Sequence, residues 1–190
     1  MLDPSALAEA SGLSEERVRA IVREELERAQ KRDPASKKAA IIASKGTLDW
    51  AYPALQIGAT AASSGMDVSI FFFMYGLNII HKDFERKLKV SPVANPAMPM
   101  PVPMPDLLTA LPGMVPMATR MMRSRFKHQG LQPIGKLLEL NREAGVRFVA
   151  CEMTLKVFGY GKEDFIEGVE FGTAAQYLTQ ARHAHLTLFV

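Results

Sequence analysis

Strand-like and helical patterns alternate along the chain from residue 39 onward, and this alternation constrains the fold more than any other feature. Strands that are apolar throughout are typical of parallel sheets, because helices cover both faces of such a sheet. We therefore predict an α/β domain with a mainly parallel sheet of about five strands, covered by helices on both faces. The predicted strands are Ala39–Ser44, Val68–Phe73, Val146–Ala150, Gly168–Phe171 and His185–Val190.

Helical patterns fill the spaces between these strands. The first runs from Leu48 to Ser64 and is closed by Gly65, a residue that commonly follows the last turn of a helix. The others have apolar positions three or four residues apart, which predicts amphipathic helices. They are Asn78–Leu88, Pro116–His128, Gln132–Ala144, Glu152–Phe158 and Thr173–His183.

Two further segments depart from the alternation. Residues 1–36 predict an amphipathic helical arm, separate from an α/β domain at 37–190 and ending at Asp33-Pro34. A Met/Pro-rich insertion at about 90–116 carries eight prolines between Val90 and Pro116, which rules out one regular element. We expect this insertion to be an adaptable apolar lid or an interface, rather than a copper site built from thioethers.

The composition excludes several classes of protein. One cysteine in 190 residues excludes an intrachain disulfide and any cluster of cysteine ligands. The N-terminus lacks the pattern of a signal peptide, and the most apolar stretch, Ser69–Ile80, is too short to span a bilayer. We therefore expect a cytoplasmic protein with a reduced thiol and no membrane association. The four histidines lack the spacing of metal ligands, and no phosphate loop or dinucleotide motif is present, so we expect no metal and no cofactor.

Cys151 is the residue most suited to chemistry. It lies at the end of the third predicted strand and directly before a helix, whose free amides and dipole would stabilise a thiolate. If the strand order is 2-1-3-4-5, strands one and three flank the ligand-binding crevice, and Lys45-Gly46 faces Cys151. Lys45 would add to the stabilisation, and Glu152 would oppose it. A thiolate can accept a sulfur atom as a persulfide and release it to another thiol. The alternative is that Cys151 is a small buried apolar residue.

Other residues could line the site or bind a partner. Met74, Tyr75 and Gly76 follow the second strand, and we expect them at the entrance of the crevice. Arg120, Arg123 and Lys127 share one helical face, which indicates either a solvated face or a docking patch for an acidic carrier or an anion.

The arm also resembles a helix-turn-helix in its apolar spacing. Glu15 and Glu16 would lie at the start of the recognition helix and would repel phosphates, and the net charge of +3 is modest. These features argue against DNA binding, although a sulfur-sensing regulator stays open as an alternative. A non-catalytic scaffold for sulfur enzymes is the second alternative.

Several stretches of the chain form a set of motifs that is specific when taken together. They are Lys38 to Asp49, Phe71-Phe-Phe-Met-Tyr-Gly-Leu, Met98-Pro-Met-Pro, Ala150-Cys-Glu-Met-Thr, and Glu163 to Gly172. Over about residues 37–182 these motifs resemble the DsrE/DsrF-like sulfur-carrier family, in particular its longer soluble subgroup. The resemblance implies a flavodoxin-like three-layer α/β/α domain that forms homo-oligomers.

The resemblance also implies a role for Cys151. In this family a cysteine accepts sulfur and passes it to TusA-type carriers, often with rhodanese-like proteins nearby, and that cysteine corresponds to Cys151. Some relatives have a further cysteine in the central segment, which this chain lacks, so a relay of two cysteines within one subunit is excluded. We expect a sulfur carrier or sulfurtransferase. Enzymatic turnover stays open, because a carrier reacts stoichiometrically with each partner.

Overall fold

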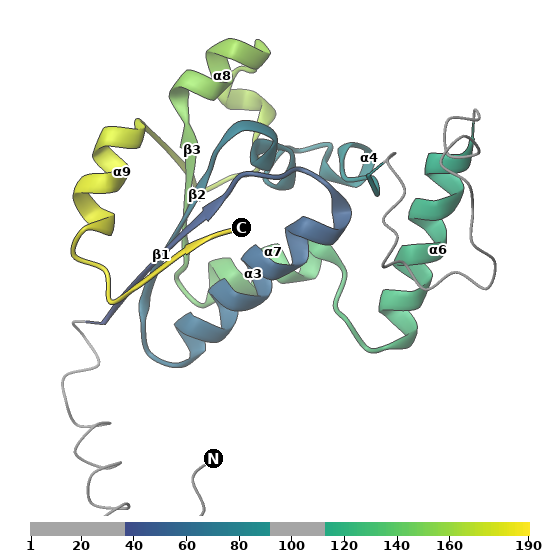
Figure 1. Cartoon of the computed structure of the whole chain (residues 1–190), viewed down its shortest axis with the longest axis horizontal. Helices are drawn as coiled ribbons and strands as arrows, with labels where there is room; N and C mark the ends of the chain where they lie inside the picture. The colour runs from purple at the N-terminus through teal and green to yellow at the C-terminus, as the bar shows by residue number, and fades with distance from the viewer. Residues whose placement is uncertain (1–36, 92–112) are drawn as a thin grey trace, which may run out of the picture. The chain divides into compact units, whose positions relative to one another are not determined.

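The centre of the structure is a five-stranded sheet in which every pair of neighbouring strands is parallel. The computed structural model describes residues 37–91 and 113–190 (Figure 1). The order of the strands across the sheet is β4-β3-β2-β1-β5. This arrangement confirms the predicted α/β class and the parallel sheet. The strands are β1 Lys38–Ala43, β2 Asp67–Phe72, β3 Arg147–Cys151, β4 Val169–Gly172 and β5 Leu186–Phe189.

The strand order differs from the order 2-1-3-4-5 that we assumed. Strand β2 pairs with β1 through Lys38↔Asp67 and with β3 through Ser69↔Arg147, so it separates the two strands expected to flank the crevice. Strand β5 instead occupies the free edge of β1. The assumed crevice between the first and third strands is therefore wrong, because each of the first three crossovers adds its strand next to the previous one.

Helices cover both faces of the sheet. Helix α3, Leu48–Ser63, and helix α7, Ile134–Glu143, pack together on one face, and helix α9, Ala174–Ala181, lies on the other (Figure 1). Crossovers between parallel strands are right-handed, so helices change face when the chain reverses its direction across the sheet. The chain moves outward from β1 to β4 and then returns past β3, β2 and β1 to form β5. Helix α9 belongs to this return crossover, which explains its position.

The two faces bury side chains to different extents. The face under α3 and α7 carries the larger core, which includes Ile41, Ile70 and Phe148. The face under α9 carries a small cluster whose sheet residues alternate with those of the larger core, as expected from the period of a strand. That cluster consists of Ala40, Phe71, Val149, Cys151, Tyr177 and Ala181.

The segment after β2 differs from the predicted helix Asn78–Leu88. It forms a 3-10 helix, η2 Met74–Ile79, followed by a short helix, α4 Phe84–Lys87. Between them, Ile80 and His81 are buried, and His81 forms an isolated antiparallel bridge with Phe165. Pairing with a distant segment thus interrupts the helical pattern.

The remaining helices agree with the predictions to within a few residues. Helix α6 spans Met114–His128, and helix α8 spans Glu152–Phe158. A 3-10 turn, η3 Lys162–Asp164, precedes β4.

Some predictions lie outside the described residues. The helical arm, the possible helix-turn-helix within it, and most of the Met/Pro-rich insertion fall in 1–36 and 92–112. Across 37–91 and 113–190, no helix is both long and apolar enough to cross a bilayer. The same two ranges contain no group of three His, Cys, Asp or Glu side chains that could hold a metal ion.

Candidate functional site

Cys151 ends β3 and is also the N-cap residue of α8. Its backbone is still extended, at φ −72° and ψ 113°, and the helix begins at the next residue, Glu152, which is half-buried. Across the sheet, Cys151 lies opposite Gly172 at the end of β4. The thiol is therefore at the carboxyl edge of the parallel sheet, where ligands of such folds gather.

The side chain of Cys151 is enclosed rather than open. Only 1% of the residue is exposed, and it belongs to the small cluster under α9. In that cluster the ring of Tyr177 stacks on Phe71, with 4.6 Å between the ring centroids. This burial agrees with the alternative left open from the sequence, a small buried apolar residue. Nothing in the sequence indicated that α9, more than twenty residues further along the chain, contributes side chains to the enclosing cluster. Access of a sulfur donor to the thiol therefore requires a movement of the side chains that enclose it.

Two glycines hold the exit loops of β1 and β2 in close contact. The amide of Gly76 donates a hydrogen bond to the carbonyl of Ser44 at 3.1 Å. A Cβ atom at Gly76 would lie 2.0 Å from the carbonyl oxygen of Ala43, and one at Gly46 would lie 2.0 Å from that of Tyr75. No side chain fits in either gap, which explains both glycines.

The loop after β2 also contacts the helix that follows Cys151. The amide of Met74 donates to the hydroxyl of Thr154 at 3.3 Å, and Met74 has a left-handed backbone with φ 50°. The ring of Tyr75 lies 5.4 Å from that of Phe158 at the end of α8. The structure thus brings Gly46, Met74, Tyr75 and Gly76 together at the edge where Cys151 lies.

Lys45 lies apart from Cys151. Its ammonium group is 3.3 Å from the centre of the Trp50 ring, a cation–π contact within the region that follows β1. Because β2 separates β1 from β3, the two strand ends are about 10 Å apart. Lys45 therefore occupies the same edge, and its ammonium group is held by Trp50.

Exposed apolar side chains surround this edge, and the sequence analysis singled out Tyr75 among them but neither Met153 nor Val157. Met153 and Val157 lie four residues apart on α8 and are 59% and 66% exposed, and Tyr75 is 62% exposed. Residues four apart share one face of a helix. The sequence does contain a signal for this surface. Met153 and Val157 are apolar, yet they lie on a different face of α8 from its buried residues, Thr154 and Leu155.

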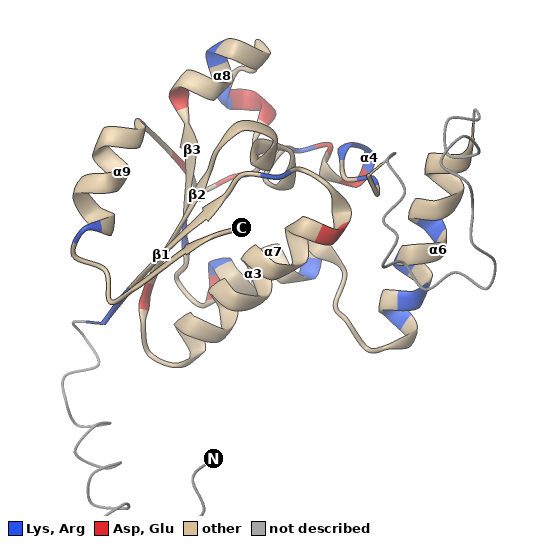
Figure 2. Cartoon of the chain, in the orientation of Figure 1, with Lys and Arg blue, Asp and Glu red and all other residues tan. Residues whose placement is uncertain are grey.

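The three predicted docking residues of α6 do not share one environment. Arg120 and Lys127 are exposed, whereas Arg123 binds the carboxylate of Glu85 at 2.9 Å. Arg123 also donates to the backbone carbonyls of Glu85 at 2.6 Å and Leu88 at 3.3 Å. Arg123 therefore fastens α6 to α4. Figure 2 shows further basic residues along α6.

Comparison with known proteins identifies the class to which this arrangement belongs. Residues 35–189 match the model of the DsrE/DsrF/DrsH-like family. The chain belongs to this family, and the resemblance inferred from its motifs is confirmed.

Two individual relatives match this chain over nearly their whole length. The chain is 44% identical over 158 residues to a protein from Allochromatium vinosum named sulfur carrier protein DsrE2, with 81% of this chain and 98% of the relative covered. It is 24% identical over 161 residues to the uncharacterized protein YrkE of Bacillus subtilis, covering 82% of this chain and 98% of the relative. Among solved structures, the ychN protein of E. coli aligns with a TM-score of 0.45 at 13% identity, over 81% of this chain and 99% of that one.

Proposed function

We propose that this protein carries sulfane sulfur as a persulfide on Cys151 and passes it to a thiol of a partner protein. The similarity to a sulfur carrier across most of the chain supports a sulfur-carrier role. The single observation that carries the residue assignment is that Cys151, the only cysteine in the sequence, lies at the carboxyl edge of the parallel sheet. No other side chain in the chain can form a persulfide.

The chemistry consists of two displacements of the same kind. The Cys151 thiolate attacks the outer sulfur of a donor persulfide. A new sulfur–sulfur bond forms at Cys151, the donor's sulfur–sulfur bond breaks, and the donor leaves as a thiolate. An acceptor thiolate then attacks the outer sulfur on Cys151, and Cys151 leaves as a thiolate. These two displacements need no external oxidant or reductant, because each one exchanges one persulfide for another.

The buried thiol requires an opening step, and α9 is the element best suited to it. Of the eight residues in α9, only Tyr177 and Ala181 are buried. An element attached by so few buried side chains can separate from the sheet at a modest cost in free energy. We propose that displacement of Tyr177 exposes Cys151 to the donor, and that the closed state shields the persulfide from solvent thiols.

The edge around Cys151 also suggests how a partner docks. The exposed apolar side chains of Tyr75, Met153 and Val157 offer contact area beside α8. We also propose that Arg120 and Lys127 attract an acidic partner, and the family resemblance implies partners of the TusA and rhodanese types. We propose that the protein works as a homo-oligomer in the cytoplasm, where a lone thiol stays reduced.

Intact-mass spectrometry tests this proposal. The protein is incubated with glutathione persulfide, and a gain of about 32 Da, the mass of one sulfur atom, is expected. The gain should be absent from Cys151→Ser, and dithiothreitol should remove it from the wild type. Equal labelling of both proteins would show that Cys151 is not the carrier.

A second candidate function is a non-catalytic scaffold for sulfur-transfer proteins. The burial of Cys151 among apolar side chains favours it, since free cysteines often serve as small core residues. On this alternative, Cys151→Ser keeps its affinity for partner proteins and the wild type acquires no sulfur. Loading of the wild type excludes it.

A further inference from the structure

A cavity of about 370 Å³ lies at the amino edge of the sheet, opposite the edge that carries Cys151. The first residues of β1, β2 and β3 form one wall, and the C-terminal half of α9 and the turn that follows it form the other. Small-molecule sites in proteins have volumes from about 300 Å³ upward, so this cavity has the size of a metabolite site. Its polar lining includes Lys38, Asp67, Ser69, Arg147, Gln180 and His183.

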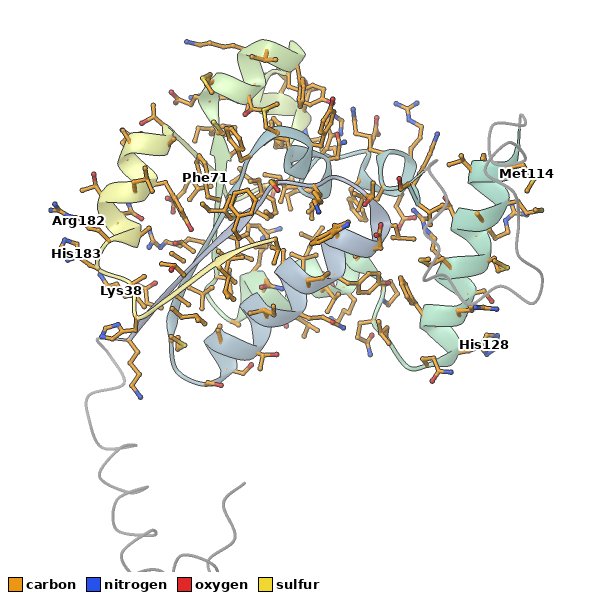
Figure 3. All side chains as sticks on the ribbon, viewed as in Figure 1. Lys38, Phe71, Met114, His128, Arg182 and His183 are labelled. Carbon is orange, nitrogen blue, oxygen red and sulfur yellow. The ribbon has the colours of Figure 1, made fainter. Side chains whose placement is uncertain are left out.

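The rim of the cavity has an excess of positive charge. Lys38 and Arg147 supply two cations, and Asp67 supplies one carboxylate, whose oxygen is 3.8 Å from Nε of Arg147. Arg147 also donates to the side-chain carbonyl of Gln180 at 3.4 Å, so it bridges the sheet and α9. Lys38 and His183 of this rim, and the neighbouring Arg182, lie close together at the left of Figure 3. A guanidinium in such a place suits a carboxylate or a phosphate.

A buried hydroxyl lies directly behind Ser69, one of the residues that line the cavity. The hydroxyl of Tyr177 is buried, and among the described residues it makes no hydrogen bond of good geometry. The Tyr177 ring stacks on Phe71, and Ser69, two residues before Phe71 on the same face of β2, lies beside the phenol. Burial raises the pKa of Tyr177 far above its usual range, with Ser69 acting in the opposite direction, so the phenol keeps its proton as a donor. An unpaired buried donor costs free energy until an acceptor meets it.

We infer that this cavity binds a small organic anion, a carboxylate or a phosphate ester, and that the bound anion holds α9 closed over Cys151. The anionic oxygens contact Lys38 and Arg147 at the rim, and the inner end of the ligand accepts a hydrogen bond from the hydroxyl of Ser69, or from that of Tyr177 behind it once the ligand displaces Ser69. Nothing in the carrier chemistry uses this cavity, because it lies at the other end of the strands from the thiol.

The coupling to Cys151 follows from the position of α9. The same helix supplies Thr179 and Gln180 to the cavity and Tyr177 to the buried cluster that contains Cys151. A ligand that bridges α9 and the sheet binds the closed state more tightly than the open state. It therefore shifts the population toward the closed state in proportion to that difference in affinity.

Binding is tested with two anions and a neutral control. Glycerol 3-phosphate represents phosphate esters, glycerate represents carboxylates, and glycerol is the control. Titrations followed by amide resonances should show changes at Ser69, Tyr177 and Gln180 with at least one anion and none with glycerol. Arg147→Gln should weaken binding at least about tenfold and Tyr177→Phe about threefold or more, whereas Lys136→Gln, an exposed cation on α7, should bind as the wild type does.

Two results would overturn the assignment of the cavity. One is the absence of shifts at these resonances with both anions at millimolar concentration. The other is wild-type affinity in Arg147→Gln. Binding of one anion and not the other identifies which of the two chemistries the cavity takes.

The coupling is tested by alkylation of Cys151 with iodoacetamide, followed by intact mass. A saturating concentration of the anion that binds should slow alkylation at least about threefold in the wild type and leave Arg147→Gln unaffected. An unchanged rate in the liganded wild type contradicts the proposal. This test relies on the proposed function only in taking Cys151 as the reactive thiol. It uses no sulfur donor, so it stays interpretable if sulfur loading fails.

Discussion

Gly76 is the residue at which the exit loops of β1 and β2 come closest. A methyl group there would overlap the carbonyl oxygen of Ala43, which belongs to the backbone of β1, a strand paired on both sides, and cannot move aside. We predict that Gly76→Ala lowers the free energy of unfolding by at least about 2 kcal/mol, measured by urea denaturation.

Gly135 offers a matched control for that substitution. It lies inside α7, and an added Cβ would have its nearest contact at 3.4 Å, the ring of Phe84. Alanine has a higher helix propensity than glycine, so Gly135→Ala should be neutral or stabilising by up to about 1 kcal/mol. Equal stability of the Gly76→Ala and Gly135→Ala proteins would contradict the packing described for the two loops.

His81 gives the fold a dependence on pH. Burial lowers its pKa below the ordinary value, with Lys87 acting in the same direction, and its Nδ1 accepts a hydrogen bond from the amide of Asp83 at 2.9 Å. The unfolded chain therefore takes up the proton at a higher pH than the folded one. Stability contributed by neutral His81 is present above about pH 6.5 and decreases as the pH falls below that value toward the lower folded pKa.

The measurement is thermal unfolding as a function of pH. We expect the melting temperature to fall between about pH 6.5 and pH 5, and we expect a smaller fall in His81→Asn, whose side-chain oxygen can still accept from Asp83. A wild type and variant with identical pH profiles would assign the dependence to other groups.

Arg123 and Arg120 lie three residues apart on α6 and differ in what they contact. Arg123 binds one carboxylate and two backbone carbonyls, so Arg123→Ala should destabilise the protein by about 1–2 kcal/mol. This figure already allows for the weakening of the ion pair by solvent at a partly exposed site. Arg120→Ala should change stability by less than about 0.5 kcal/mol. Urea denaturation of both variants measures the difference, and similar effects would mean that Arg123 does not fasten α6.

Single residues were predictable from the sequence only where the signal was local. The position of Cys151 between a strand and a helix follows from its neighbours, and so do the glycines that follow β1 and β2. The enclosure of Cys151 and the contact between Lys45 and Trp50 depend on which side chains meet in space. The left-handed backbone of Met74 has no sequence signal, because methionine does not favour that conformation.

Helix α9 is the element on which access to the thiol depends. Tyr177→Ala removes the ring that stacks on Phe71 and covers the cluster containing Cys151, so it lowers the cost of exposing the thiol. We predict that it raises the rate of alkylation of Cys151 by iodoacetamide at least about tenfold, corresponding to about 1.4 kcal/mol or more.

Leu178 on the same helix is the matched control. Its side chain is 60% exposed, so Leu178→Ala removes a similar apolar group without uncovering the cluster. Its alkylation rate should equal that of the wild type. If both variants react at the wild-type rate, another element covers Cys151.

At the scale of elements, periodicity predicted most helices and strands because each depends on its own residues. Helix α8 has the predicted bounds, and α3 differs from its prediction by one residue. The predicted helix Asn78–Leu88 was wrong, because Ile80 and His81 pack against a distant segment and break the local pattern. Tertiary contacts override propensity where a segment is short and buried.

At the scale of the whole molecule, the α/β class was predictable and the strand order was not. Alternating strands and helices require a parallel sheet, and nothing in that alternation says which strands are neighbours. The first crossovers each add a strand next to the previous one, so β2 lies between β1 and β3. The return crossover through α9 then places β5 beside β1. In this order Lys45 lies away from Cys151, and α9 packs on the face of the sheet that buries the thiol, so loading of Cys151 requires an opening step.

Peptide-level mass spectrometry of the sulfur-loaded protein tests the central claim most directly. Trypsin releases residues 148–156, a peptide that contains Cys151 and ends at Lys156. After treatment with glutathione persulfide and capping with iodoacetamide, this peptide should carry one additional sulfur, about 32 Da above the ordinary alkylated form. A peptide that carries only the ordinary alkyl group, from protein fully exposed to the donor, would contradict the assignment of Cys151 as the sulfur carrier.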